Sequence, residues 1–455
     1  MDDLVAARLQ MAISLGFHIV FACIGMTMPW LMAAAQWKFI RTRRPVYLQL
    51  ARAWSKGVAV FFAVGAVSGT VLSFELGLLW PKFMEHAGPI IGLPFSWEGT
   101  AFFVEAIAIG IFLYGFGRVP ERIHFASGIV VGLSGVASGV LVVAANSWMN
   151  SPAGFRWVDG QAVDVDPVAA MFNPAWPSQA LHMTLAAFVS TAFGVAGVHA
   201  FRLLKNPSSE MHRIALRVAL AIGAVAALLQ PLSGDISAQH VTKRQPAKLA
   251  AMEAHYHTER NASFMLGGIP DDDKQVVRGA IEIPYLLSLL AHHDPFAEVT
   301  GLDRIPRENW PPTLICHIAF QIMIAAGTAL AGLGTAFLGM LWLRPKWLEH
   351  RRFLKVVAAA TPLGFIAVEA GWTVTEVGRQ PWIIYGVLRT KDAVTPMPGL
   401  VWPLMFMLVV YLVLGVVIAW IMTHLIRLAE DAEKRGTSAD EFADPAPPSP
   451  KAAHG

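Results

Sequence analysis

The chain has 455 residues, of which 55% are hydrophobic and only 15% are charged. Soluble domains contain about 45–50% apolar residues, so this composition excludes an ordinary soluble protein and indicates an integral membrane protein. The formal net charge is only +3 and the basic residues gather in short segments, which argues against a nucleic-acid-binding surface.

Nine segments are apolar and long enough to cross a bilayer, whose hydrocarbon core of about 30 Å takes about 20 helical residues. The sequence therefore predicts an all-α membrane protein with a bundle of about nine transmembrane helices. Residues 1–427 form the predicted membrane domain, and the polar stretch 428–455, rich in Pro and Ala, is expected to be a disordered tail. The predicted spans are 10–36, 56–80, 97–117, 124–148, 178–203, 213–234, 313–343, 353–375 and 399–427.

Basic residues follow the first, third, fifth and seventh spans, whereas the alternate loops are poor in Lys and Arg. Loops rich in basic residues remain in the cytoplasm, so the N-terminus is expected outside and the C-terminal tail inside. The hydrophilic segment 235–311 is then an outer loop. The basic residues are Lys38, Arg41, Arg43, Arg44, Arg52 and Lys56; Arg118 and Arg122; Lys205 and Arg213; and Arg344, Lys346, Arg351, Arg352 and Lys355.

The cysteines and the first hydrophobic segment each exclude one feature of the protein. Cys23 and Cys316 show neither CxxC nor CxxCH spacing, which excludes a covalently attached c-type haem and leaves no obvious thiolate metal site. The first hydrophobic segment lacks a basic leading region and a small-residue cleavage site, so no cleavable signal peptide is expected.

Several polar side chains fall inside the predicted spans, where ionisable groups are costly and indicate function by default. A helix rises 1.5 Å per residue, which places six of these groups within about 15 Å of the outer face, in one layer. The six are His18, Glu75, Glu98, His182, Met323 and Glu376, and the others are Glu105, His199 and Glu369.

A layer of one Met, two His and several carboxylates on different helices suits porphyrins. A low-spin b haem takes two strong axial ligands, for which His with Met is a known pair, and an oxygen-binding haem keeps one side open. Helix-bundle interiors are where such sites are built.

Each of these residues also has a plainer interpretation. An intramembrane His is otherwise a hydrogen-bonding group between helices. Met323 is one of 18 methionines, for which core packing is the ordinary role, and carboxylates near the interface can simply be hydrated. His199 and His317 are interpreted as structural because nothing at helical spacing completes a site around them, and Glu369 is left without a role.

Glu98 and Glu105 are seven residues apart and therefore lie on one face of the third helix. Glu105 is expected about 10 Å deeper, towards the cytoplasm. Such a pair suits a proton path that leads inward from a redox layer. The alternative is a pair of carboxyl groups neutralised by buried hydroxyls.

Seven sequence motifs then stand out: the box GRQPW at 378–382 within GWTVTEVGRQPWIIYGVLRT, RLQMAISLGFHIVFA, SFELGLLWP, SWEGTAFFVEA, LHMTLAAFV, SGDISAQHVTKRQPAKLAAMEAHYHTE and FQIM. On these motifs the chain resembles subunit I of the cytochrome bd-type quinol oxidases across essentially the whole membrane portion. The resemblance implies an enzyme that oxidises quinol at the outer face and reduces O2 to water with cytoplasmic protons, generating proton motive force without pumping.

By that resemblance, His182 and Met323 would be the axial ligands of a low-spin b haem. His18 and Glu376 would each ligate one haem of a high-spin pair, beside which Glu98 would lie. The cofactors would be two b-type haems, one low-spin and one high-spin, and haem d or a third b haem in its place. Which haem of the pair binds oxygen differs between family members, so His18 and Glu376 are not assigned further.

Other residues match family positions outside the ligand set. Glu105 looks like the proton-path carboxylate. Lys248 and Glu253, in QPAKLAAMEA, match positions of quinol oxidation in the outer loop, which the family calls the Q-loop. Trp372, Arg379 and Gln380 would lie beside the haem pair.

The box GRQPW also has a direct physical interpretation. Arg379 can offset carboxylate or propionate charge through its fork of donors. Pro381 is expected to stop the helix that carries Glu376, and Trp382 is expected at the membrane interface.

Partners and location follow from the same resemblance. A second membrane subunit, a small single-span subunit, quinol, O2 and lipid would be the partners, without nucleic acid, in a bacterial or archaeal cytoplasmic membrane. Two features depart from the common pattern: Gln321 stands where many family members carry Arg, and the outer loop is short, as in a branch that includes cyanide-insensitive oxidases.

Three other classes fit less well. A haem-copper oxidase needs more intramembrane His than this chain has. A secondary transporter is disfavoured because no inverted repeat is visible and the polar residues gather near one face. A haem-bearing membrane anchor would explain His182 and Met323 but not the remaining site residues.

Overall fold

The computed structural model describes residues 1–158 and 160–435, and nearly all of their regular structure is helical. Nine helical segments in this part are apolar and long enough to cross a membrane, which confirms the predicted all-α bundle. Eight are single helices and the ninth is split. They are α1 (Asp3–Thr42), α2 (Pro45–Leu79), α3 (Pro81–Tyr114), α4 (Glu121–Asn150), α6 (Trp176–Lys205), α7 (Glu210–Arg244), α10 (Thr313–Leu343), α11 (Arg351–Ala359) with α12 (Leu363–Val377), and α14 (Val401–Arg435).

Several boundaries differ from the predicted ones because hydropathy records only the apolar part of a helix. Helix α3 begins at Pro81, a favourable first position for proline, so Glu98 lies in its middle instead of at its start. Helix α7 continues to Arg244, past the predicted start of the long loop at residue 235. Helix α14 runs to Arg435, which makes the first part of the predicted tail helical; residues 436–455 lie outside the described part.

The predicted span 353–375 is not one continuous helix. It is divided into α11 and α12 at residues 360–362. Pro362 has no backbone N–H to donate and disfavours a helical conformation at the residue before it. The break lies where α6 comes very close: a Cβ at Gly364 would lie 2.4 Å from Cα of Ser190, so only glycine fits there.

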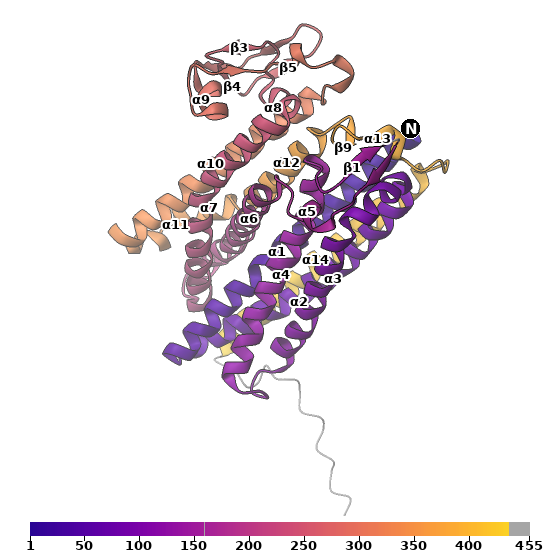
Figure 1. Ribbon diagram of the computed structural model, residues 1–455. Coiled ribbons are helices and arrows are strands. Elements are labelled where there is room, and N and C mark those ends of the chain that lie inside the picture. Colours follow the sequence, from indigo (N-terminus) through magenta and orange to yellow (C-terminus); the bar gives the residue numbers. More distant parts are fainter. Residues whose placement is uncertain (159, 436–455) are drawn as a thin grey trace, which may run out of the picture.

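Helix packing gives the bundle a clear order. Helix α1 packs against α2, α4 and α6, α3 packs against α4, α6 against α7, and α10 against α12 and α7. The main apolar core is shared by these helices and includes Leu31, Phe112, Phe193 and Leu220, which are essentially inaccessible to solvent. In Figure 1 the small β elements, the long loop and the N-terminus all lie at one end of the bundle.

The long loop is a small folded unit on top of α7 and α10. It opens with helix α8 (Pro246–Glu253) and continues with three nested antiparallel strand pairs and a short helix. The pairs are β5 (Ile269–Asp271) with β6 (Val276–Arg278), β4 (Phe264–Leu266) with β7 (Ile281–Ile283), and β3 (Glu259–Arg260) with β8 (Glu298–Val299), and the helix is α9 (Leu286–His292). A second cluster holds β1 (Arg156–Val158), β2 (Gln161–Val163), α5 (Pro167–Met171), β9 (Trp382–Ile384), β10 (Leu388–Arg389) and α13 (Thr390–Ala393).

Two polar side chains of α10 attach the loop to the bundle. The ring nitrogens of His317 lie 3.0 Å from the carbonyl oxygens of Met252 and of Gly267. Gln321 donates to the carbonyl of Met265 at 2.9 Å and accepts from the N–H of Gly267 at 3.0 Å. The departure from arginine at position 321 therefore has a local function, because a guanidinium has no acceptor for that N–H.

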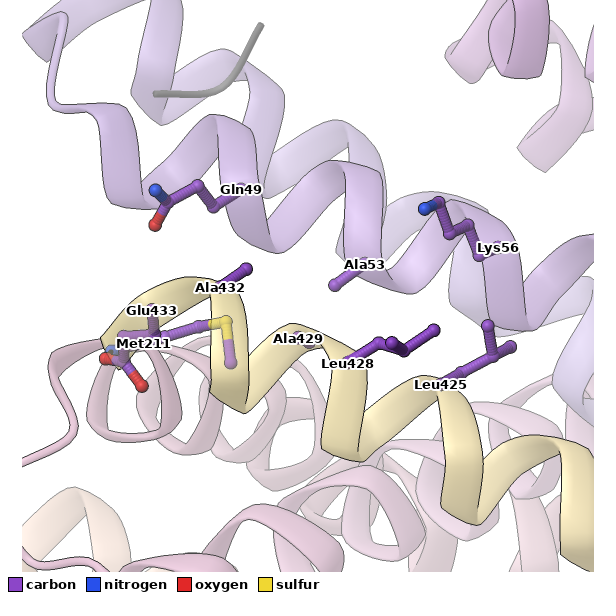
Figure 2. A pocket seen from close by; sticks show the side chains of 9 residues that line it. All are labelled: Gln49, Ala53, Lys56, Met211, Leu425, Leu428, Ala429, Ala432 and Glu433. Atoms are coloured by element: carbon purple, nitrogen blue, oxygen red, sulfur yellow. Dashed lines mark hydrogen bonds between the residues drawn. The ribbon is translucent and has the colours of Figure 1, made fainter. Parts of the chain in front are cut away.

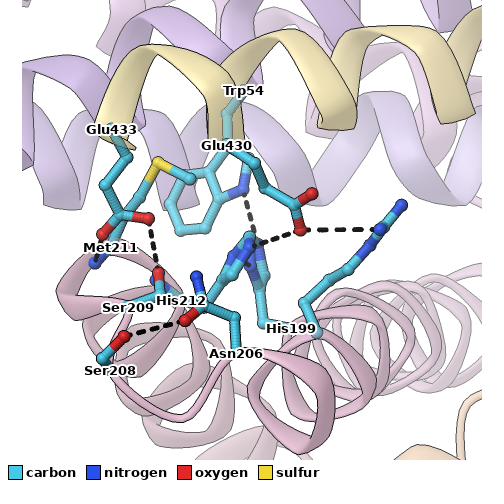
Figure 3. A network of polar contacts seen from close by, with 10 residues as sticks. Trp54, His199, Asn206, Ser208, Ser209, Met211, His212, Glu430 and Glu433 are labelled. Atoms are coloured by element: carbon cyan, nitrogen blue, oxygen red, sulfur yellow. Dashed lines mark hydrogen bonds and ion pairs between the residues drawn. The ribbon is translucent and has the colours of Figure 1, made fainter. Parts of the chain in front are cut away.

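The opposite end of the bundle is held by a buried chain of hydrogen bonds (Figure 3). The indole of Trp54 donates to Nε2 of His199 at 3.2 Å, and Nδ1 of His199 lies 2.9 Å from Nδ1 of His212. Nε2 of His212 lies 3.1 Å from Glu430 of α14. Since indole only donates and carboxylate only accepts, each His must be neutral and donate onward, which fixes both tautomers.

The last turns of α14 dock beside this chain. Glu433 accepts hydrogen bonds from the hydroxyl of Ser209 at 2.6 Å and from the N–H of Met211 at 3.0 Å. Figure 2 shows α14 running beside α2 here, with Leu428 and Ala429 near Ala53 around a small pocket. His199 thus takes part in helix packing far from the loop.

Candidate functional site

His18 lies on α1 and is supported by α2. Its Nδ1 is 2.9 Å from Oγ of Ser68, and the same hydroxyl donates to the carbonyl of Val64 at 2.8 Å. Because the only proton of Ser68 is committed to that carbonyl, Ser68 accepts from the imidazole. His18 is therefore protonated on Nδ1, and its Nε2 lone pair is available to a ligand. The ring packs against Gly69, where a Cβ would lie 3.1 Å from Cε1.

His182 on α6 has the same support from α7. Its Nδ1 is 3.0 Å from Oγ of Ser233, and Ser233 donates to the carbonyl of Gln230 at 2.9 Å. Nε2 of His182 is again the unprotonated nitrogen, and its neighbour is Nε2 of Gln230 at 3.3 Å. The amide of Gln230 donates to the carbonyl of His182 at 3.2 Å, which further fixes this turn of α6.

Met323 and Glu376 complete the predicted ligand set. Sδ of Met323 lies on the α12 side of α10: a Cβ at Gly371 would be only 2.9 Å from it. Glu376 is the last residue but one of α12 and is bound on both oxygens. Nδ2 of Asn146 donates to Oε1 at 2.5 Å, and Nη2 of Arg379 donates to Oε2 at 2.5 Å.

The box GRQPW folds back from α12 at this point. Arg379 is only 2% exposed, and its Nε and Nη1, like Nε1 of Trp372, are buried without a hydrogen-bond partner among the described residues. Gln380 accepts from the hydroxyl of Thr390 at 2.9 Å. Helix α12 ends at Val377 with Gly378 as its cap, before Pro381 is reached, and Trp382 opens strand β9.

These residues fit haem in two respects. Two imidazoles present an unprotonated Nε2, and a thioether and a carboxylate come from other helices, which are the axial ligand types of haem iron. Three buried donors near Glu376 have no acceptor within residues 1–158 and 160–435, and anionic propionates are the kind of group that would satisfy them. An open apolar groove of about 880 Å³ lies between α1, α10 and α12, but Glu369 is its only ionisable lining residue and none of the candidate ligands lines it.

The carboxylates of α3 and α2 are placed against neighbouring helices. Glu98 accepts from the hydroxyl of Ser138 on α4 at 2.9 Å. Glu105 also faces α4, since a Cβ at Gly135 would lie 3.5 Å from its Oε1. Glu98 and Glu105 thus share one face of α3. Glu75 is buried and accepts from Gln10 of α1 at 2.8 Å.

Glu369 lines the groove between α1, α10 and α12. Its Oε1 is buried without a hydrogen-bond partner in the described part of the chain, and its Oε2 packs against Gly16. It remains without an assigned role.

Lys248 and Glu253 lie on α8, outside the spanning helices. Lys248 is 3% exposed and donates to Oδ1 of Asn150 at 2.5 Å. Burial, and next the charge of Arg379, lowers its pKa to about 7. Burial alone raises the pKa of Glu253 to about 8, and Oε2 of this carboxyl has no partner among the residues described. Close to neutral pH the two groups therefore titrate in adjoining ranges.

Sequence reasoning missed the residues that support the candidate ligands. Ser68, Ser233, Asn146 and Asn150 are 50 to 230 positions from the groups they bind, and no local pattern joins them. The only signal in the sequence was a set of small polar residues on otherwise apolar helices, which is also the ordinary composition of packed membrane helices.

The fold by itself defines a multi-pass membrane protein with polar groups buried between its helices. A family model described as cytochrome bd terminal oxidase subunit I matches residues 6–430. A putative cytochrome bd menaquinol oxidase subunit I of Bacillus subtilis (strain 168) is 37% identical over 435 residues, covering 94% of this chain and 97% of the relative. A cytochrome bd ubiquinol oxidase subunit 1 of the same strain is 31% identical over 443 residues, covering 94% of each chain.

The solved structure of a bd oxidase from Geobacillus thermodenitrificans matches with a TM-score of 0.89 and 37% identity, covering 94% of this chain and 98% of that one. The chain belongs to the cytochrome bd terminal oxidase subunit I family. It is therefore a subunit of a quinol oxidase, a haem protein of a bacterial inner membrane that works with a subunit II.

Proposed function

We propose that this subunit oxidises quinol at the outer face of the membrane and reduces O2 to water at a high-spin haem pair. Cytoplasmic protons are consumed, and proton motive force arises without a pump. Family membership supports the reaction class. The observation that carries the haem arrangement is the repeated His–Ser pair, which leaves the Nε2 atoms of His18 and His182 unprotonated; Nε2 of His182 is also 3.3 Å from the amide nitrogen of Gln230, which would turn aside for iron.

In this proposal His182 and Met323 hold a low-spin b haem, while His18 and Glu376 each hold one member of the high-spin pair. When bound, these haems supply one-electron transfer and the binding of oxygen. Arg379 and Trp372 direct free donors towards the Glu376 site, and Gln380, through its bond to Thr390, holds the box in place beside it. The oxygen site takes haem d or a third b haem.

Quinol oxidation is placed at Lys248 and Glu253. Quinol is uncharged, and each molecule gives up two electrons and two protons. Between pH values of about 7 and 8 Lys248 is largely a neutral amine and Glu253 largely a neutral acid. The pair can therefore accept from and donate to the quinol hydroxyls without burying a net charge. The protons leave at the outer face, and the quinol is menaquinol or ubiquinol, the two named for the relatives.

Proton uptake is placed on α3 and α4. Reduction of one O2 to two waters takes four electrons and four protons, so two quinols are oxidised per O2. With the N-terminus outside, Glu105 is the deeper of the two carboxylates and passes protons to Glu98, which Ser138 holds by its hydroxyl. Proton release at the outer face and proton uptake from the cytoplasm separate charge across the membrane. A small single-span subunit beside subunit II completes the proposed complex.

The deciding experiment is a reduced-minus-oxidised absorption spectrum of the purified complex, with haem extraction and with CO added to the reduced form. A chlorin band with a CO-reactive haem indicates haem d, and b-type haem alone with CO reactivity indicates the variant with three b haems. Lack of a CO-reactive high-spin haem would overturn the proposal. Met323→Leu is expected to remove the low-spin spectrum and quinol oxidation together, and a full low-spin signal would refute that ligand.

A further inference from the structure

The side chain of Lys248 crosses the GRQPW box before it reaches its polar partner. A Cβ at Gly378 would lie 2.8 Å from Cγ and 3.2 Å from Cε of Lys248. The backbone of Gly378 has a φ of −67°, which any residue adopts, so glycine is needed there for space. The loop helix α8 and the box are thus packed directly against each other through this lysine.

The Nζ atom of Lys248 forms a hydrogen bond with Asn150, the last residue of α4. It donates to Oδ1 of Asn150 at 2.5 Å, and Asn150 is only 1% exposed. Nδ2 of Asn150 donates to the carbonyl of Asn146 at 3.0 Å, and Gln245 donates to the carbonyl of Asn150 at 2.7 Å. The acceptor is therefore held from two sides. Because Nδ2 of Asn150 donates to the carbonyl of Asn146, its Oδ1 is the atom that faces Nζ, and the orientation of the Asn150 amide is fixed.

The same turn of α4 also reaches the end of α12. The amide of Asn146 makes two contacts: its Nδ2 donates to Oε1 of Glu376 at 2.5 Å, and its Oδ1 accepts from Nδ2 of Asn150 at 3.3 Å. Arg379 binds the other oxygen of Glu376 at 2.5 Å. A continuous set of hydrogen bonds thus runs from Lys248 through α4 to Glu376 and Arg379.

From this arrangement we infer that Asn150 is a positioning residue for quinol oxidation. Asn150 fixes the position of Nζ of Lys248 in the quinol site. Through its contact with Asn146, it also fixes that position relative to Glu376. The inference rests on the proposed role of Lys248. The proposal assigns Asn150 no contact with quinol or O2, because the residue acts by holding the lysine.

The test measures quinol oxidase kinetics in the complete complex carrying Asn150→Ala. A control is Asn173→Ala, because Asn173 is equally buried and binds the same end of α4, at Ala144 (3.1 Å) and Ser147 (2.9 Å), without touching the lysine. A buried hydrogen bond between neutral groups is worth up to about tenfold in binding. Asn150→Ala is therefore expected to raise the quinol KM about tenfold, with little change in kcat or haem content. Asn173→Ala should leave KM unchanged.

Two further variants make each outcome decisive. Asn150→Asp keeps an oxygen at the Oδ1 position and is expected to restore a KM near that of the parent, even if the alanine variant is poorly folded. A KM raised as much by Asp as by Ala, or equal in the Asn150→Ala and Asn173→Ala variants, would overturn the inference alone. If Lys248→Ala itself leaves KM and kcat unchanged, the quinol role of the lysine fails, and the inference fails with it.

Discussion

The hydrogen bond between His182 and Ser233 is the contact whose loss should be most informative. Ser233→Ala removes the acceptor of the Nδ1 proton at 3.0 Å. The amide nitrogen of Gln230, 3.3 Å from Nδ1, offers no substitute because it is a donor. An unsatisfied buried N–H costs about 1–3 kcal/mol. Loss of an outer partner of a metal-binding His typically lowers affinity about 10–100-fold, or about 1.4–2.8 kcal/mol, so the two estimates agree.

The expected result is a complex with less low-spin haem, or with that haem at a lower occupancy after dilution, measured from reduced-minus-oxidised spectra and from extracted haem. Ser233→Thr keeps the hydroxyl and should retain the haem. Ser237→Ala is the matched control, since Ser237 lies one turn further along α7 and its hydroxyl donates to the carbonyl of Ser178 at 3.3 Å. If Ser233→Ala and Ser237→Ala have the same low-spin haem content, the assignment of Nε2 as the iron ligand through Ser233 is wrong.

Three further predictions address the proton path, the quinol site and the far end of the bundle. Glu105→Gln should slow oxygen reduction while haem content stays intact, and unchanged turnover would remove Glu105 from the path. For quinol oxidation, kcat/KM should fall below a pH of about 7, where Lys248 becomes charged, and above a pH of about 8, where Glu253 ionises. Lys248→Met should flatten the acid limb of this profile, and Glu253→Gln should flatten the alkaline limb. A parent profile without either limb would contradict the assignment. His199→Leu breaks the hydrogen-bond chain at α14 and should lower the free energy of unfolding by about 1–3 kcal/mol, measured by thermal melting of the complex, whereas the exposed His424→Leu should not.

Much of the membrane architecture was predictable because long apolar helices are imposed by the bilayer itself. Eight of the predicted spans fall on single helices, and the larger errors arise where helices continue into polar sequence, as α7 does to Arg244. The break at 360–362 carried a signal, since Pro362 interrupts the run. The break was not predicted because hydropathy is averaged over a window, in which a single proline has little effect.

The sequence by itself determined the class of protein, the number of spans and the chemical types of the candidate ligands, because burial in lipid makes every polar residue conspicuous. It also carried the motifs that led to the family. Only the tertiary structure decided which groups support those residues: Ser68 behind His18, Ser233 behind His182, and Asn146 with Asn150 between Glu376 and Lys248. These contacts join helices far apart in the chain, and the direction of a side chain between packed helices depends on neighbours that no local pattern specifies.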